Sequence, residues 1–480
     1  METALPAGGS PGDGRPALKR PSVWGWISFD FAAQPFFTVV VTFVFGPYFV
    51  ARLAPDPATG QAAWAGAMTV SGLLLALAAP VLGAVADRAG PRKPWLAALA
   101  LAKIAALCAL WTAAPGTSLF LAAAFVVTAS VAAELSIVLN DSMMPSLVER
   151  PSIGLVSNIA WGLGYGGGMI ALIGTVLFLS ADPDTGLTLL GLPALFGLDA
   201  AEGEGARATG PLSALWYLVF VLPMFWLVPD RSRRADPPAR AIREGLAELA
   251  GTWREVRKRA ALFRFMLARV LYQDGVNGVL VLGGPFAAGM FGWSVVESGL
   301  FGIILNVAAI AGCGLAGLVD RRLGSKSVVM ASILCLVAAT IGIVSTAPGS
   351  TLFGLVTFAA GPDGGFFDSG AEKAFLLFGG LIGIAFGPIQ ASSRSWLAQS
   401  VEPAEAGRYF GLYALTGRVS SFLAPLSVAT LTAFAATRTD PATASRLGMS
   451  ALIAFFLAGL LVLLTTRDPR HERLEDRRAG

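Results

Sequence analysis

The chain has 480 residues, of which 55% are hydrophobic and only 14% are charged, and its formal net charge is +4. Soluble domains are nearer one quarter charged, so this composition excludes an ordinary soluble protein and predicts an integral membrane protein. Three cysteines in apolar runs and one histidine near the C-terminal end provide no pattern for a disulfide framework, a metal site or histidine catalysis. We expect no metal, cofactor or nucleic-acid partner, because Lys and Arg in such a chain report orientation.

Residues 1–22 are polar and rich in Pro and Gly, and they lack the short apolar core of a cleaved signal peptide. We interpret them as a disordered cytoplasmic tail. Twelve apolar spans follow and form two sets of six, an N-terminal bundle over 23–229 and a C-terminal bundle over 266–466. Windows of about 19 residues place the spans near 24–50, 62–86, 95–114, 117–140, 154–180, 211–229, 266–290, 297–319, 327–347, 372–393, 407–431 and 448–466.

The connecting segments predict orientation, because most of the 35 Lys and Arg residues fall on one side of this topology. Such an excess marks the cytoplasmic side and predicts that both termini, including the tail 467–480, are cytoplasmic. The linker 230–265 is basic and has apolar residues at helical spacing, so an amphipathic helix on the cytoplasmic membrane face is expected. On the outer side, the loop 348–371 contains GPDGGFFDSG, and this stretch is preceded by TLFGLVTFAA, which is either an extension of the ninth span or a surface segment.

The two sets of spans resemble each other in order. GAVADRAGPRKPW (83–95) follows the second span and GLVDRRLGSKSV (317–328) follows the eighth, each with an acid, an Arg, a Gly and a further base. VERPSIG (148–154) and VEPAEAG (401–407) follow the fourth and tenth spans. Together these pairs predict two six-helix repeats in parallel orientation within an all-α integral membrane fold.

The first span contains an acid, Asp30, which forms a polar stripe at every fourth residue with Gln34, Thr38 and Thr42. Such a stripe faces protein or water. Pro35 removes a helical hydrogen-bond donor one turn after the acid, so an interruption is expected there.

The seventh span holds a corresponding acid, Asp274, followed by Gly275 and Gly278, and an interruption is predicted there as well. Acids inside a membrane are functional by default, so a pore-facing or coupling role is the leading interpretation for both. The alternative is that each aspartate only pairs with a base, Arg269 or Arg418, and holds helices together. Arg418 is their partner or a site for an anionic group of the solute.

Further polar residues lie within the spans. Lys103 either joins them or extends its amine toward the inner surface, and the latter is the favoured interpretation. Glu134 and Asp141 are two turns apart on one helix face; Glu134 is a coupling candidate or a packed hydrogen-bonding group, and Asp141, nearer the cytoplasm, is a gate candidate. The remaining solute candidates are amides and aromatics that could cradle a small polar molecule or simply lie near the membrane interface: Asn158, Trp161, Tyr165, Asn277, Gln390 and Tyr413.

WGLGYGGG (161–168) has the glycine spacing of a dinucleotide loop, but no strand precedes it and it lies in an apolar run. Close packing between helices is therefore favoured over nucleotide binding. The sequence contains no GxxxxGK[ST] loop either, so direct ATP hydrolysis is not expected and a gradient would drive transport.

These residues resemble the major facilitator superfamily. GAVADRAGPRKPW is similar to its general loop motif, and FDFAAQ, LYQDGVNGVL and above all IQASSRSWLAQSVEPAEAGRYFGLYALTGRVSSFLAP (389–425) resemble the unknown major facilitator family, which includes the vacuolar amino-acid effluxers of fungal autophagy. The resemblance covers roughly 22–466 and implies the major facilitator fold, transport of amino acids and a cytoplasmic latch. The gate candidates that it implies are Asp87, Arg88, Arg92, Lys93, Asp320, Arg321 and Arg394.

The chain departs from the family pattern at two places. Ala33 and Gln34 stand where the family has Asn and Ser, and Asp141 stands where it tends to have Asn. Both changes concern pore positions, so the substrate need not be the family's.

The sequence thus predicts a secondary transporter, not an enzyme, that moves a small polar solute by alternating access with protons as the coupling ion. We expect a monomer in the cell (inner) membrane, surrounded by lipid. Two alternatives remain: a transporter of lipids or amphiphiles with the same fold and, remotely, a membrane-embedded enzyme, for which neither GxSxG nor HExxH occurs.

Overall fold

The computed structural model describes residues 16–53, 57–88, 90–181, 185–188, 190–230, 240, 244, 251–291, 293, 295–359, 367–417 and 423–466. The C-terminal tail, most of the N-terminal tail and half of the linker 230–265 lie outside the described residues, as does Arg418. The predictions for these parts remain predictions.

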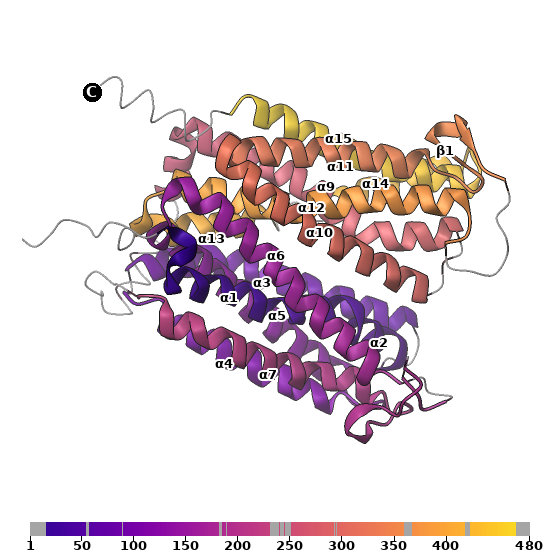
Figure 1. Ribbon diagram of the computed structural model, residues 1–480, viewed down its shortest axis with the longest axis horizontal. Helices are drawn as coiled ribbons and strands as arrows, with labels where there is room; N and C mark the ends of the chain where they lie inside the picture. The colour runs from indigo at the N-terminus through magenta and orange to yellow at the C-terminus, as the bar shows by residue number, and fades with distance from the viewer. Residues whose placement is uncertain are drawn as a thin grey trace, which may run out of the picture. The chain divides into compact units, whose positions relative to one another are not determined.

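Long helices form both halves of the chain (Figure 1). Ten of those that the structure describes are long and apolar enough to cross a membrane. The predicted seventh and eleventh spans correspond to α9 and to the pair α13 and α14. In the first half the helices are α1 (Pro21–Pro35), α2 (Phe45–Tyr48), α3 (Pro57–Arg88), α4 (Lys93–Ala109), α5 (Leu119–Leu147), α6 (Arg150–Phe178) and α7 (Glu204–Leu227). In the second half they are α9 (Ala260–Phe291), α10 (Val295–Leu323), α11 (Ser325–Ser345), α12 (Gly370–Ser400), α13 (Ala406–Thr416), α14 (Leu423–Ala436) and α15 (Pro441–Leu464).

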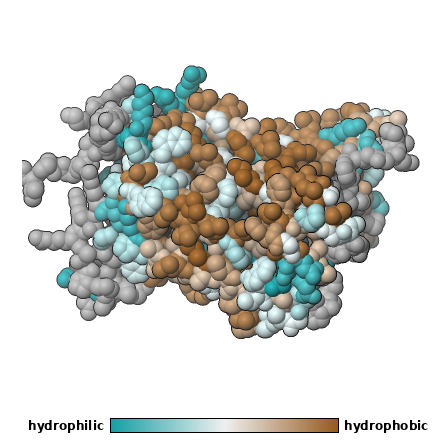
Figure 2. All heavy atoms as spheres, turned by 60° about the horizontal axis from the view of Figure 1, so that its bottom comes forward, coloured by the Kyte–Doolittle hydropathy of each residue, from teal (hydrophilic) through white to brown (hydrophobic). Residues whose placement is uncertain are grey.

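The chain divides into two compact units. The first contains Met1–Leu249 with Leu397–Gly411, and the second contains Ala250–Trp396 with Leu412–Gly480. In the first unit α1 packs against α6 and α7, and α5 packs against α3 and α4; in the second, α15 packs against α9, α11 and α14. On the face shown in Figure 2, hydrophobic residues cover the middle of the helices and hydrophilic residues gather toward the ends, as expected for helices that cross a bilayer.

The first span is interrupted, as predicted. α1 ends at Pro35 and continues as a π-helix, η2 (Phe36–Phe43), in which the Val44 amide donates to the Val39 carbonyl at 2.9 Å. The backbone then leaves helical geometry at Val44, before α2 and a second π-helical segment, η3 (Phe49–Leu53). Proline removes one donor, and the wider turn reconnects the remaining groups.

The predicted interruption of the seventh span is wrong, because α9 is one continuous helix. Its two glycines allow close packing against α15 instead: a Cβ built at Gly275 would lie 3.0 Å from the Phe456 ring, and one built at Gly278 would lie 2.5 Å from Leu452. The break in this half is found in the eleventh span, where α13 ends at Thr416 and α14 is described from Leu423.

Gly164, Gly167 and Gly168 of WGLGYGGG lie against the first span, which confirms the packing interpretation. A Cβ at Gly167 would be 2.7 Å from the Phe31 carbonyl oxygen, and one at Gly168 would be 2.4 Å from the Thr38 hydroxyl. The polar stripe of α1 therefore faces the backbone of α6.

The segment TLFGLVTFAA does not extend the ninth span. Its first residues form a small hairpin of β1 (Ser350–Thr351) and β2 (Val356–Thr357), paired antiparallel through Thr351 and Val356. The alternative of a surface segment is correct, since the turn between the strands is exposed.

Candidate functional site

Asp274 is a buried acid on α9 that accepts a hydrogen bond from the backbone of α14. Its side chain on α9 is 1% exposed, and its Oδ2 accepts a hydrogen bond of 2.9 Å from the amide of Ala424 in the first turn of α14. Its Oδ1 has no hydrogen-bond partner among the described residues. The partial positive charge at a helix N-terminus stabilises an anion, so α14 offsets part of the cost of burying this carboxylate.

Arg269, five residues earlier on α9, forms hydrogen bonds with α13. Its guanidinium donates to the Tyr413 carbonyl at 2.9 Å and to the Thr416 hydroxyl at 2.8 Å, and it lies 3.5 Å from the centre of the Tyr413 ring. A cation at the C-terminal end of a helix is stabilised by the helix dipole. The described contacts of Arg269 thus go to α13, and the predicted alternative in which Arg269 pairs with Asp274 is wrong.

α9 therefore contacts both helices of the eleventh span with side chains of opposite charge. Arg269 bonds the end of α13, and Asp274 bonds the first turn of α14. Of the other candidates in this unit, Asn277 accepts a hydrogen bond of 3.2 Å from Gln273, a residue that the sequence analysis did not identify. Gln390 is half-buried on α12.

In the first unit the predicted polar stripe is partly buried. Asp30 and Gln34 are half-buried and Thr38 is buried, whereas Thr42 is exposed and donates to the Phe37 carbonyl at 2.8 Å. The stripe therefore ends after three residues, within the part that packs on α6.

The candidates on α5 and α6 are placed as follows. Glu134 is half-buried and Asp141 is buried on α5. On α6, Asn158 is fully buried and donates to the Gly154 carbonyl at 2.9 Å, and the rings of Trp161 and Tyr165 contact each other with 5.7 Å between centroids.

Asn140 was missed by the sequence reading. Its side chain is fully buried on α5, and neither amide atom has a hydrogen-bond partner among the described residues. Its carbonyl accepts a hydrogen bond of 2.8 Å from the Trp26 indole. A buried amide without partners costs free energy, so Asn140 joins the solute candidates. An Asn inside an apolar run, next to Asp141, was the available signal.

Lys103 does not extend to the inner surface, so that prediction is wrong. The residue is 1% exposed on α4, with its Nζ 3.9 Å from the centre of the Tyr217 ring and 5.3 Å from that of Phe36. Its amine has no hydrogen-bond partner among the described residues. Cation–π contact is its main stabilisation.

The start of α4, where two of the predicted latch residues lie, is bonded to the end of α7 and the residues after it. The backbone amides of Arg92 and Lys93, at the start of α4, donate to the carboxylate of Asp230 at 3.1 and 2.8 Å, and the Lys93 amine donates to the Phe225 carbonyl near the end of α7 at 2.6 Å. The side chains of Asp87 and Arg88 lie outside the described residues.

In the second unit Asp320 is fully buried on α10 and accepts hydrogen bonds from Ser325 at 3.0 Å and Ser392 at 2.7 Å. The neighbouring serines of the Gln-x-x-Ser-Arg-Ser element bond further helices, Ser393 with Tyr272 and Ser395 with Ser325, both at 2.7 Å. The element thus joins α12 to α9, α10 and α11. Arg394 lies between two of these serines in the sequence, and its side chain is buried, whereas Arg321 is exposed.

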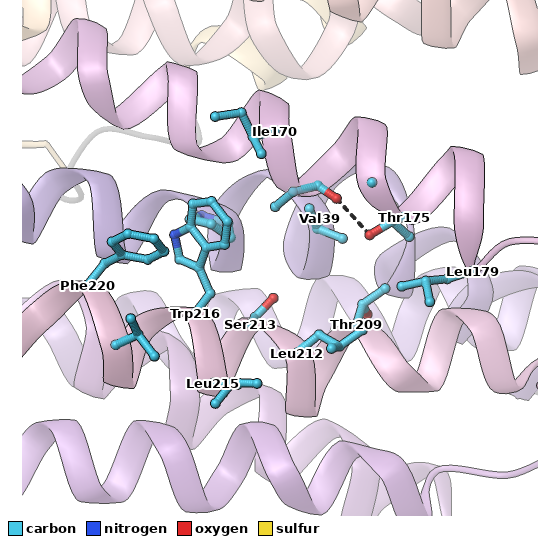
Figure 3. A pocket seen from close by; sticks show the side chains of 14 residues that line it. Val39, Ile170, Thr175, Leu179, Thr209, Leu212, Ser213, Leu215, Trp216 and Phe220 are labelled. Atoms are coloured by element: carbon cyan, nitrogen blue, oxygen red, sulfur yellow. Dashed lines mark hydrogen bonds between the residues drawn. The ribbon is translucent and has the colours of Figure 1, made fainter. Parts of the chain in front are cut away.

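A cavity of about 400 Å³ lies between the first span, α6 and α7 (Figure 3). Exposed apolar side chains such as Ile170 and Leu215 line it, and three of its polar side chains are bonded within the protein: Thr175 donates to the Ala171 carbonyl, Thr209 to the Ala206 carbonyl and Trp216 to the Phe31 carbonyl. It therefore suits a hydrocarbon chain better than a polar solute.

Comparison with known proteins is consistent with this geometry. The family described as "Vacuole effluxer Atg22 like" matches residues 61–474. The chain belongs to this family. It is a multi-pass membrane protein and a secondary transporter of the major facilitator type.

Individual relatives are distant. The uncharacterized MFS-type transporter YxiO of Bacillus subtilis (strain 168) is 25% identical over 91% of this chain and 93% of its own length. Autophagy-related protein 22 of Cryptococcus neoformans var. neoformans serotype D (strain B-3501A) is 26% identical over 50% of this chain, and the match spans 43% of that protein. The crystal structure of the human organic anion transporter MFSD10 superposes with a TM-score of 0.64 over 94% of this chain and 100% of that chain, at 16% identity. This similarity shows the fold.

Proposed function

We propose that this transporter moves amino acids or similar small polar metabolites in exchange with, or together with, protons, and that Asp274 is the group in the second unit that binds the proton or the solute's ammonium group. The observation that carries the proposal is the carboxylate itself. One oxygen is fixed by the start of α14 and the other has no partner among the described residues. A buried carboxylate in this state gains free energy by taking up a proton or a cation.

The position of Asp274 beside a divided span supports the same proposal. Transporters bind substrate where helices are discontinuous, since free backbone groups there can contact the solute. Asp30, on the turn before the Pro35 break, is the corresponding candidate of the first unit. The further candidates on α5 and α6 are Glu134, Asn140, Asn158, Trp161 and Tyr165. The resemblance to amino-acid effluxers supports the substrate class.

We further propose the cell membrane as location, a monomer as the working form, and cytoplasmic termini. The excess of Lys and Arg on the side of the linker supports the orientation. The vacuolar location in the family's description fits the fungal relatives and leaves the direction of transport in this chain to be measured.

Solute counterflow in proteoliposomes tests the proposal. Purified protein is reconstituted with a panel of amino acids, with and without a pH gradient, and uptake of labelled solute is measured. We expect exchange of at least one panel member and accumulation against its gradient when the pH gradient is present. No exchange of any member overturns the substrate class.

The variant Asp274→Asn tests the residue. An amide oxygen can still accept the Ala424 hydrogen bond, so the cap of α14 is kept while the titratable oxygen is lost. We expect proton-driven accumulation to disappear and folding to be retained. Asp30→Asn is compared in parallel, and unchanged accumulation in Asp274→Asn would assign this acid to capping alone.

A further inference from the structure

Two connecting loops contain the same four residues, Leu-Phe-Gly-Leu, at 195–198 and 352–355. In each loop the first three form a single 3-10 turn, η5 (Leu195–Gly197) and η6 (Leu352–Gly354). In each, the phenylalanine has a left-handed backbone, with φ of 64° at Phe196 and 58° at Phe353.

Left-handed geometry is unfavourable for a bulky side chain. The Gly197 amide donates to the Ala194 carbonyl, and the Leu355 amide donates to the Leu352 carbonyl, both at 3.2 Å. The first bond places Phe196 third in a β-turn, and the second places Phe353 and Gly354 at the centre of the hairpin turn. Turns with positive φ at these positions normally use Gly, Asn or Asp. The phenylalanines are therefore not chosen for local folding.

Packing does not explain them either. Phe196 is 76% exposed and Phe353 is 68% exposed, and Leu355 beside the second turn is 86% exposed. A strained residue that contacts little of its own protein indicates a role outside the fold.

Both turns are close to the ends of membrane-spanning helices. Phe196 lies eight residues before the first residue of α7, and Phe353 lies eight residues after the last residue of α11. The hairpin is also held at the end of α11 by a hydrogen bond of 2.8 Å between the hydroxyls of Thr346 and Thr351. In the twelve-span topology both loops are on the same side of the membrane, opposite the basic linker.

We propose that the two Leu-Phe-Gly-Leu turns are membrane anchors, which place Phe196 and Phe353 at the boundary between lipid headgroups and acyl chains of the leaflet on their side. Residues 187–198 and 347–358 contain no charged side chain. A soluble partner would find no charged side chain on these loop tips, and only a few hydroxyl groups for side-chain hydrogen bonds. The tips instead fit the boundary between headgroups and acyl chains, where aromatic side chains are enriched. Each turn leaves its phenylalanine side chain largely exposed.

Site-specific labelling in liposomes tests this proposal without relying on transport. Cys108, Cys313 and Cys335 are replaced by Ala, and single cysteines at Phe196→Cys or Phe353→Cys receive an environment-sensitive fluorophore. The matched controls are Ala201→Cys in the first loop and Thr437→Cys in the loop before α15, which are exposed positions beside charged residues.

We expect lipids with a nitroxide high on the acyl chain to quench the probes at 196 and 353 by about twofold or more relative to the controls. Iodide in the water should quench the two anchor positions less than the controls. Equal quenching by iodide at all four positions would overturn the proposal, and would be the outcome if these turns bind a soluble protein instead.

A second measurement separates anchoring from folding. Phe353→Gly removes the ring and suits the positive φ, so the melting temperature in detergent should not fall. A clear fall would show that the ring stabilises the fold and would count against an anchor.

Discussion

The first and the eleventh spans are both interrupted inside the membrane, yet the two breaks are stabilised in different ways. In the first, Pro35 is followed by a π-helix whose groups bond within the same segment, as the Val44 amide does with Val39, and an uncharged side chain of α7, Trp216, bonds the Phe31 carbonyl. In the eleventh, side chains from another helix complete the ends: Arg269 bonds the end of α13, and Asp274 bonds the start of α14.

The difference determines which break can respond to a ligand. Backbone groups in a bilayer need hydrogen-bond partners because no water replaces them. The π-helical break supplies partners within its own segment, and the Phe31 carbonyl, four residues before Pro35, accepts from the Trp216 indole of α7, which does not titrate. The eleventh span depends on the charge of the Asp274 carboxylate on α9. A proton or ammonium group bound there would directly alter the stabilisation of α14. This makes the second break the better candidate for coupling solute binding to helix movement.

Arg269 provides the strongest test of this dependence. Arg269→Met removes a charged donor from two acceptors and the contact with the Tyr413 ring, so the free energy of unfolding in detergent should fall by roughly 2–4 kcal/mol. Arg269→Lys keeps the charge but not the planar stacking, and should lose about half as much. The midpoint of denaturant or thermal unfolding measures both.

If Arg269→Lys is as stable as the wild type, stacking and geometry do not matter at this break, and a point charge is sufficient. If Arg269→Met is equally stable, the contact of Arg269 with α13 is not a stabilising feature.

For the first span, the comparison predicts sensitivity to packing instead of charge. Gly167→Ala would place a methyl group 2.7 Å from the Phe31 carbonyl oxygen, which belongs to the backbone and cannot move away alone. We expect a loss of about 1–3 kcal/mol. Gly166→Ala is the matched control, since a Cβ at the adjacent position meets nothing within 4 Å. Similar stability of the two variants would show that α1 and α6 separate easily.

The sequence predicted this part of the molecule well. A proline within a span, a polar stripe of period four and a glycine-rich neighbour are local signals, and each has a direct geometric consequence. Hydropathy likewise located the spans, because the length of a crossing helix is fixed by the bilayer. The largest boundary errors are seven residues: α7 begins at Glu204 and α15 at Pro441, before the predicted starts of the sixth and twelfth spans, and α5 ends at Leu147 and α12 at Ser400, after the predicted ends of the fourth and tenth.

The second break could not be located in this way. Asp274 has glycines beside it, which suggested that its own helix was interrupted, but those glycines accommodate Phe456 and Leu452 of α15. The acid instead acts on a helix about 150 residues away in sequence. The same applies to the serines at 392–395, whose partners lie on three other helices. Such contacts are set by tertiary packing, on which the local pattern carries no information.

Lys103 gives the opposite result to Arg269, although both are buried cations in spanning helices. It contacts aromatic rings and has no hydrogen-bond partner among the described residues, so Lys103→Met keeps most of the packing and removes the cost of burying an ammonium group. We expect the variant to be as stable as the wild type or more stable by about 1 kcal/mol. Thermal unfolding in detergent measures this.

Lys103→Ala is the control for packing, because it also removes the charge but leaves a cavity, and it should be less stable than Lys103→Met. A loss of stability in Lys103→Met as large as that in Arg269→Met would contradict the contrast and indicate a stronger role for the amine. Loss of transport without loss of stability would assign Lys103 to the transport cycle.

The smallest effect concerns Asp440, which caps α15 outside the membrane as Asp274 caps α14 inside it. The Thr443 amide donates to the Asp440 carboxylate at 2.9 Å, and this hydrogen bond holds the pKa of Asp440 below its ordinary value. A lowered folded-state pKa means that the charged cap stabilises the fold above the unfolded-state pKa, about 3.9, and that this contribution is lost as the pH falls through the folded-state value. Because Asp440 is exposed, water competes for the same hydrogen bond, and the gain in stability is small.

The difference in melting temperature between the wild type and Asp440→Ala should therefore be constant near neutral pH and should shrink only under acid conditions. A difference that grows on acidification would mean that the carboxylate is not acting as a charged cap, and the analogy between the two acids would fail on the aqueous side.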